Sequence, residues 1–283
     1  MKPSELYVKL LRWGIYISLF LPLVIFSQYL SPFHFGKAVV FRSLVEIMAV
    51  IYILLVISNK KYLPSFRNPI VATVTIFTGL YTLCSFIAVD FNYAFWGTLE
   101  RMGGLFSFLH FWVFFIILIS IFNKGNANAT NEHANATNNA NNDWMKLLKL
   151  SIVVGFLSIL FAYGQHFKMG NFFVGWQHAS RVIGTIGNAA LFAGYLIFVL
   201  FLDIYLLIKN NTNATNEHAN ATNYANRYKL EKVFYGLVLI LGILVLLMTA
   251  VRGSIIAFFG GLFLLGLIYL FSPALPVRPE GGP

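Results

Sequence analysis

Three arginines set in glycine-rich turns are the residues of this chain best suited to chemistry. Arg101 lies within GTLERMGG, Arg181 opens RVIGTIGN, and Arg252 lies within TAVRGS. An arginine beside the free backbone N–H groups of a helix start is a good receptor for phosphate oxygens, because its guanidinium offers a bidentate fork and glycine lets the backbone approach closely. Three such turns on one face of a protein predict a diphosphate site.

Each arginine also has a simpler possible role than binding a diphosphate. A single arginine of this kind often reaches lipid headgroups or pairs with a neighbouring acid such as Glu100 or Asp90. Three arginines in similar settings favour the anion site. The residues expected to support it are Lys37, Arg42, Glu100, Asn188 and His178.

Polar residues inside apolar stretches are the other candidates. Arg42 and Glu46 are spaced i,i+4, so they could neutralise each other on one helix face. His110 and Asp203 also lie within apolar runs, and we interpret both as satisfied core residues rather than as a proton relay. The stretch 164–188 is polar and aromatic, and we expect it to rest on the outer surface of the protein.

The composition decides what kind of scaffold positions these residues. Of 283 residues, 58% are hydrophobic and only 11% are charged, and the mean hydropathy is +0.74. A soluble domain carries about 25% charged residues, so this composition excludes an ordinary soluble enzyme. It excludes a disordered chain as well, because the apolar content is too high. We therefore predict an all-α, polytopic helical bundle embedded in a lipid bilayer.

Eight apolar runs are long enough to cross about 30 Å of hydrocarbon. They lie roughly at 13–30, 38–57, 69–88, 105–122, 147–163, 188–208, 233–250 and 254–271. With the N-terminus in the cytoplasm, 14 of the 20 Lys and Arg residues fall inside and six fall outside. This asymmetry follows the positive-inside rule, so the net charge of +10 is an insertion signal and does not indicate nucleic acid.

The expected domain is a single transmembrane unit over residues 1–271, followed by a Pro/Gly-rich tail at 272–283. Two low-complexity cytoplasmic inserts are expected at about 124–143 and 210–227. Each contains the sequence NATNEHANATN, at 128–138 and at 213–223. Asn, Ala and Thr without aromatic residues offer little to pack, so the inserts are predicted to be solvated loops.

Short motifs that carry other chemistries do not occur in the sequence. There is no hydrolase elbow, P-loop, HExxH or CxxC pattern. One histidine in each insert is too sparse for a metal site. The sequence therefore indicates no metal, nucleotide or redox cofactor.

The three turns, in this order, resemble the O-antigen ligase and polymerase family, polytopic enzymes that act on lipid-linked sugars. The matching stretches are FWG and ERMGG around Arg101, then Arg181 with GTIGN and AGYL, then RGS at Arg252. The stretches KA at Lys37 and RSLVE at Arg42 are also similar. The resemblance covers roughly residues 30–270.

The resemblance implies a metal-independent glycosyltransferase of cell-surface polysaccharide and lipopolysaccharide biosynthesis. Such an enzyme passes an undecaprenyl-diphosphate-linked glycan to a glycan or lipid acceptor at the outer face of the bacterial cytoplasmic membrane. Arg101, Arg181 and Arg252 would hold the diphosphate and stabilise its charge as it leaves. Family members continue with a large outer loop that supplies a histidine base. No counterpart of that histidine occurs here, so we expect a truncated or shortened member.

Two other functions stay open at this point. The same arginines would serve a transporter or flippase that moves an anionic lipid or solute across the membrane. Transporters often contain an inverted repeat, and the sequence shows none. A membrane subunit without catalytic activity is the other alternative.

Overall fold

The structure, a computed structural model, describes residues 3–26, 31–98, 101–123, 133–170, 181–216 and 222–271. Within these ranges the regular elements are all helices, which confirms the predicted all-α bundle. The longer helices are α1 (Pro3–Ser18), α2 (Phe35–Ser58), α3 (Pro69–Phe86), α5 (Leu105–Asn123), α6 (His133–His166), α8 (Ala189–Asn216), α9 (Thr222–Met248) and α10 (Arg252–Phe271). The short helices are η1 (Leu21–Leu23), η2 (Lys60–Tyr62), α4 (Phe91–Trp96) and η4 (Gly184–Ile186).

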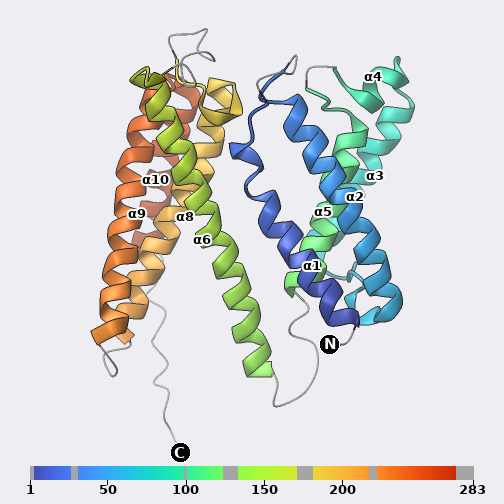
Figure 1. The fold of residues 1–283 in the computed structure, drawn as a ribbon, viewed down its shortest axis with the longest axis horizontal. Helices are drawn as coiled ribbons and strands as arrows, with labels where there is room; N and C mark the ends of the chain where they lie inside the picture. Colours follow the sequence, from blue (N-terminus) through green and yellow to red (C-terminus); the bar gives the residue numbers. More distant parts are fainter. Residues whose placement is uncertain are drawn as a thin grey trace, which may run out of the picture.

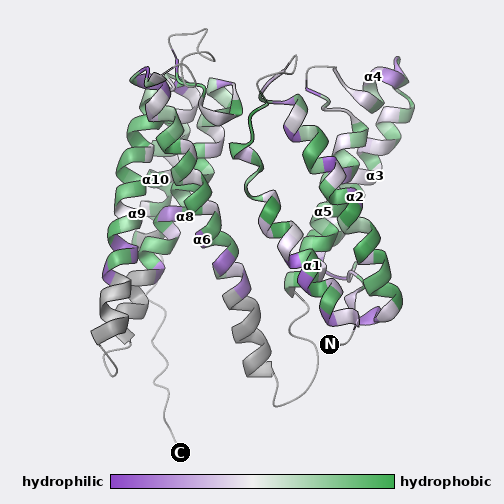
Figure 2. Ribbon diagram, viewed as in Figure 1, coloured by the Kyte–Doolittle hydropathy of each residue, from purple (hydrophilic) through white to green (hydrophobic). Residues whose placement is uncertain are grey.

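Seven stretches of the described chain are long and apolar enough to cross a membrane. They are Pro3–Leu23, Phe35–Ser58, Pro69–Phe86, Leu105–Phe122, Asp143–His166, Ala189–Lys209 and Lys229–Met248. The eighth predicted span corresponds to α10, whose apolar part, Arg252–Ile268, is shorter. Hydrophobic residues run along the helices in Figure 2. The chain is therefore a multi-pass membrane protein that lies in a lipid bilayer.

The first span differs from its prediction, because it starts at Pro3 rather than near residue 13. The predicted apolar run began just after the charged residue Arg12, whereas the structure places Arg12 inside α1. Arg12 Nη2 lies 2.9 Å from Asp143 Oδ2, at the start of the fifth span. This ion pair lets a charged residue lie in the helix, since its partner comes from a neighbouring one.

The helices form two bundles that lie side by side (Figure 1). In the first, α1, α2 and α5 enclose a buried core that includes Leu11, Ile15, Met48, Leu55 and Ile117. Helices α3 and α4 pack onto α5 at the edge of this bundle. The N-terminus lies at one end of the bundles, which we call the proximal end, and the opposite end is the distal end (Figure 1).

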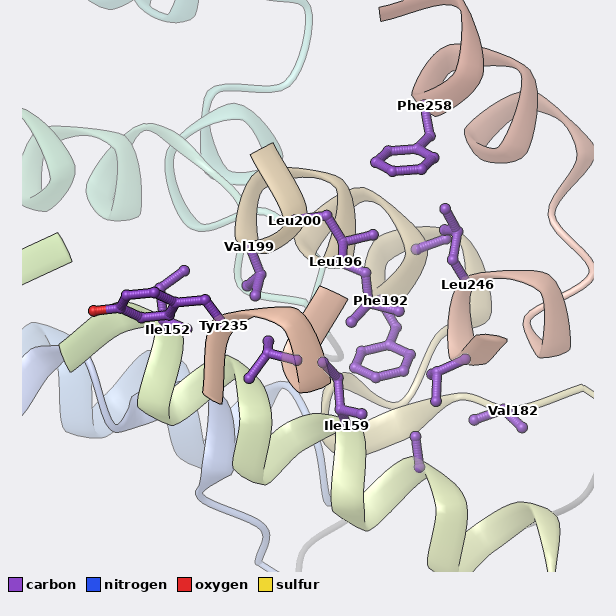
Figure 3. Close-up of a cluster of buried hydrophobic side chains, with 14 of the residues drawn as sticks. Ile152, Ile159, Val182, Phe192, Leu196, Val199, Leu200, Tyr235, Leu246 and Phe258 are labelled. Carbon is purple, nitrogen blue, oxygen red and sulfur yellow. The ribbon is translucent and has the colours of Figure 1, made fainter. Parts of the chain in front are cut away.

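The second bundle consists of α6, α8, α9 and α10. Its core is built from aliphatic and aromatic side chains, among them Ile159, Phe192, Leu196, Leu200 and Phe258 (Figure 3). Helices approach closely at Gly242 of α9, where a Cβ atom would lie 2.7 Å from Leu200 Cδ2 of α8. The close packing of α6, α8 and α9 gives the distal turns of this bundle a rigid base.

The helices extend further into the predicted inserts than the sequence indicated. Helix α6 begins at His133, α8 ends at Asn216 and α9 begins at Thr222, whereas loops were expected over about 124–143 and 210–227. No proline or glycine interrupts the chain from His133 into the apolar run of α6, so helical hydrogen bonding continues. The remaining parts of the inserts, and the tail at 272–283, lie outside the described residues.

Candidate functional site

The three arginine-bearing turns all lie at the distal end of the protein (Figure 1). Arg101 lies between α4 and α5, Arg181 lies just before η4, and Arg252 is the first residue of α10. The first turn belongs to the first bundle, and the other two belong to the second. This places three cations on one side of the membrane, as the sequence pattern predicted.

All three arginine side chains are exposed. Within the described part of the chain, the structure records no hydrogen bond or ion pair from any of their guanidinium groups. Arg12 and Arg42, by contrast, have partners within the protein. The three distal arginines are therefore available to bind an anion from outside the protein.

Arg42 builds the turn that carries Arg101. It is 7% exposed, and its Nη2 atom donates a hydrogen bond to the Met102 carbonyl at 2.7 Å and another to the Ser107 hydroxyl. Its guanidinium also lies 5.1 Å from the centre of the Phe106 ring. Glu46 lies close enough to Arg42 for their opposite charges to interact, as the i,i+4 spacing suggested, while the hydrogen bonds of Arg42 go to this loop and Glu46 also contacts His110.

The backbone of the Arg101 turn is tightly folded. Gly97 adopts φ +73°, and a Cβ atom on Gly104 would lie 2.3 Å from the Phe95 carbonyl oxygen, so both positions require glycine. Met102, next to Arg101, also has a positive φ of 49°. Such a conformation in a non-glycine residue costs free energy and persists only where neighbouring contacts enforce it, as Arg42 does here.

Gln165 builds the Arg181 turn in the second bundle. Its amide accepts a hydrogen bond from the Gly184 N–H at 2.8 Å and donates one to the Gly184 carbonyl at 3.4 Å. We expected the stretch that begins at residue 164 to rest on the surface, but Gln165 is fully buried at the end of α6. An amide satisfies both backbone groups at once, and that explains its burial.

Lys37 joins the two bundles near this turn. Its Nζ atom donates a hydrogen bond to the Thr185 carbonyl of η4 at 2.5 Å and to the Pro22 carbonyl of η1 at 2.9 Å. Close to it, Phe33 packs against Gly187, which has φ +81°. Lys37 therefore fixes the distal end of α2 against the Arg181 turn, with two of its three N–H donors bonded to backbone carbonyls.

Asn188 has a local structural role. Its Oδ1 atom accepts hydrogen bonds from the N–H groups of Ala190 and Leu191, so it caps the start of α8. Glu100 and His178, the other two supporting residues predicted from the sequence, lie outside the described residues. Of the five predicted supporting residues, Lys37, Arg42 and Asn188 thus hold backbone groups in place. None of these three has a recorded contact with the side chain of Arg101, Arg181 or Arg252.

The Arg252 turn is the tight connection between α9 and α10. Ala250 adopts φ +51°, and the fully buried Thr249 hydroxyl donates a hydrogen bond to the Leu246 carbonyl at 2.7 Å. The first backbone N–H groups of α10 have no carbonyl partner within the helix. Arg252 therefore lies beside free N–H donors, the combination that favours a phosphate oxygen.

Two polar groups lie deeper in the membrane region. His110 of α5 has partners on both ring nitrogens, Phe106 O at 2.7 Å and Glu46 Oε1 at 3.2 Å. Asp203 of α8 is fully buried, and among the described residues neither of its carboxylate oxygens has a hydrogen-bond partner. The interpretation of both as satisfied core residues therefore fits the contacts of His110 and fails for Asp203.

Sequence reasoning missed Gln165 and Ser107 as residues that position the site. The signal for Gln165 is its place after Gly164 at the end of a long apolar run, where a buried amide needs a backbone partner. No group of three potential metal-ligating His, Cys, Asp or Glu side chains occurs among the described residues. No protein-family model, curated protein or solved structure matches this chain.

Proposed function

We propose that the distal end of this protein binds the diphosphate of a polyprenyl-diphosphate-linked glycan through Arg101, Arg181 and Arg252. The observation that carries the proposal is the presence, at one end of a membrane bundle, of three exposed guanidinium groups for which no partner is recorded among the described residues. Each belongs to a turn with a positive φ that buried side chains hold in place. A lipid tail would lie in the bilayer while its diphosphate stays at the membrane surface beside these cations.

The chemistry that such a site supports is transfer of the glycan from the diphosphate to an acceptor. A diphosphate is a good leaving group when cations stabilise the charge that develops as the bond to the sugar breaks. We therefore propose an O-antigen ligase/polymerase-like glycosyltransferase at the outer face of a bacterial cytoplasmic membrane. The acceptor is a glycan or a glycolipid, and the reaction belongs to cell-surface polysaccharide biosynthesis.

The test is transfer by the protein reconstituted in lipid nanodiscs. An undecaprenyl-diphosphate-linked trisaccharide is supplied as donor and also as acceptor, and released undecaprenyl diphosphate is measured. Arg101→Ala, Arg181→Ala and Arg252→Ala should each reduce release at least tenfold. Arg67→Ala is the matched control, because Arg67 is an exposed arginine in the turn before α3, at the proximal end. Equal release by wild type and all three distal variants would refute the proposal.

A further inference from the structure

Helix α4 connects the distal ends of α3 and α5, at the edge of the first bundle that lies away from the second (Figure 1). A row of aromatic rings fixes it there. Phe91, its first residue, stacks on Phe86, the last residue of α3, with ring centres 5.3 Å apart. Phe95 and Trp96, at its other end, lie 5.8 Å and 5.2 Å from the ring centre of Phe106, the second residue of α5. Helix α4 therefore lies level with the ends of the two spans.

The lengths of these two spans indicate where their ends lie in a bilayer. Helix α3 has 18 residues and α5 has 19. At a rise of about 1.5 Å per residue, each is about 27–28 Å long, close to the thickness of about 30 Å of the hydrocarbon core. A segment level with the ends of both spans is therefore expected at the boundary between the acyl chains and the lipid headgroups.

Most of the large exposed side chains at this level are apolar. We call residues 87–96 the boundary segment. In it, Ile87 is 77% exposed, Val89 is fully exposed, and Tyr93 and Trp96 are exposed by half or more. Contact with water would be unfavourable for an apolar surface of this extent. The surface also continues the exposed apolar surface of the spanning helix α3, which is formed by Ile76, Phe77, Leu80, Leu83 and Phe86.

The polar groups of the boundary segment suit lipid headgroups better than acyl chains. Asp90 caps the start of α4, because its Oδ1 atom accepts a hydrogen bond from the Tyr93 N–H at 3.0 Å, and Asn92 is exposed. Tyrosine and tryptophan are enriched where membrane meets water, since each combines an apolar ring with a polar group. Apolar, aromatic and polar side chains together indicate the membrane–water interface.

The boundary segment is tightly joined to the turn that carries Arg101. A Cβ atom on Gly104 would lie 2.5 Å from the backbone nitrogen of Gly97, the residue that ends α4. The two ends of the turn are thus in direct backbone contact. The Arg101 turn cannot change its depth in the membrane unless α4 moves with it.

We propose that the boundary segment is embedded in the lipid leaflet at the distal end and holds the Arg101 turn at the level of the lipid phosphates. Lipid is the partner of its exposed surface: acyl chains contact Ile87 and Val89, and the headgroup region contacts Tyr93 and Trp96. This inference goes beyond the proposed function and does not depend on which anion Arg101 binds. A lipid-linked phosphate in the same leaflet would meet Arg101 without leaving the membrane.

The first test measures the depth of nitroxide labels on the protein in nanodiscs. In a Cys84→Ser background, Val89→Cys and Tyr93→Cys are labelled singly, and collisions with oxygen, which concentrates in lipid, are compared with collisions with a water-soluble nickel chelate. Leu80→Cys, exposed within α3, is the lipid reference, and Ser65→Cys, exposed in the proximal turn, is the water reference. The ratio of oxygen to nickel collisions at Val89 and Tyr93 should be several-fold higher than at Ser65 and lower than at Leu80.

Two other results of this test would overturn the proposal. Frequent collisions with the nickel chelate and few with oxygen at Val89, as at Ser65, would place the boundary segment in water. Few collisions with either reagent would mean that a protein surface, such as a second copy of the chain, covers it in place of lipid.

A label at Arg101→Cys in the same background tests the depth of the turn, whether or not this residue binds a diphosphate. Its depth should match that of a lipid with a nitroxide on its headgroup. Replacement of both Ile87 and Val89 by asparagine should shift the label towards water, because the boundary segment loses its apolar contact with lipid. Replacement of both Leu63 and Phe66 by asparagine, which changes two exposed apolar residues of the proximal turn, is the matched control and should leave the depth unchanged. A label in water beyond the headgroups, or a depth that the Ile87→Asn, Val89→Asn variant leaves unchanged, would overturn the proposed role of the segment.

Discussion

At the residue scale, the positions of Arg101 and Arg181 depend on buried or half-buried side chains that hold the backbone of their turns. Arg42 holds the Met102 carbonyl, Gln165 holds both backbone groups of Gly184, and Lys37 holds the Thr185 carbonyl. Each contact satisfies backbone groups in turns that contain positive φ angles, at Met102 in the first turn and at Gly184 and Gly187 in the second. The arginines that face outward are thus placed by side chains that face inward.

Replacement of Arg42 by lysine tests this division of roles. Lysine keeps the charge but lacks the planar fork, in which Nη2 donates to the Met102 carbonyl and to Ser107 while Nη1 contacts the Met102 sulfur. We expect Arg42→Lys to weaken undecaprenyl diphosphate binding about tenfold, or about 1.4 kcal/mol, because the Arg101 turn loses its support. Binding measured in nanodiscs, with Arg12→Lys as the control, checks this. Unchanged affinity in Arg42→Lys would show that the turn holds its shape alone.

Asp203 gives a prediction on stability. Its carboxyl group is fully buried and has no hydrogen-bond partner in the part of the chain that the structure describes, so we expect it to destabilise the folded protein. Asp203→Leu should raise the free energy of unfolding by about 1–3 kcal/mol and raise the Tm in thermal unfolding of the nanodisc-embedded protein. A lower Tm would mean that Asp203 has a stabilising partner.

At the element scale, the second bundle depends on close helix approach, and the sequence reveals it only partly. Gly242 lies in an apolar run in which a glycine has no evident purpose until α8 is placed beside α9. Leu200 and Ile159 then fill the space that a side chain at this position would occupy. The hydrophobic pattern of the sequence does not show which faces of α8 and α9 pack together, because apolar residues lie on all faces of their membrane-spanning parts.

A substitution at Gly242 tests this packing. Gly242→Val would force branched methyl groups into Leu200 and Ile159, and we expect a loss of about 1–3 kcal/mol in the free energy of unfolding. Gly236→Val, at a glycine of the same helix with open space around it, should have a much smaller effect. Similar Tm values for the two variants would contradict the observed contact between α8 and α9.

At the whole-molecule scale, the sequence predicts the helical membrane bundle well and its polar contacts poorly. Apolar runs identify the spans because the bilayer requires them, and the three arginine turns fall at one end as their order along the spans predicts. The start of α1 was wrong because Arg12 finds Asp143 in a helix far along the chain. The contact of Arg42 with Glu46 could be predicted from the i,i+4 spacing, but its hydrogen bonds to Met102 and Ser107 could not, because these residues lie far along the chain.

The orientation of the protein, with its distal end outside the cell and its proximal end in the cytoplasm, is itself testable. In a Cys84→Ser background, which removes the single cysteine of the chain, Asn92→Cys lies at the distal end and Ser65→Cys lies in the turn before α3. With the N-terminus inside, a membrane-impermeant thiol reagent applied to intact cells should label Asn92→Cys and spare Ser65→Cys. The reverse pattern would place the arginine turns in the cytoplasm and exclude an outer-face reaction.

The most direct measurement is the difference in affinity between undecaprenyl diphosphate and undecaprenol, which lacks the phosphates, for the protein in nanodiscs. Wild type should bind the diphosphate at least 100-fold more tightly, since charge-assisted hydrogen bonds each contribute about 1.5–3 kcal/mol. The triple variant Arg101→Ala, Arg181→Ala and Arg252→Ala should lose this preference, while Arg67→Ala keeps it. Equal affinity of the wild type for the two lipids, or a preference that survives in the triple variant, would contradict the account.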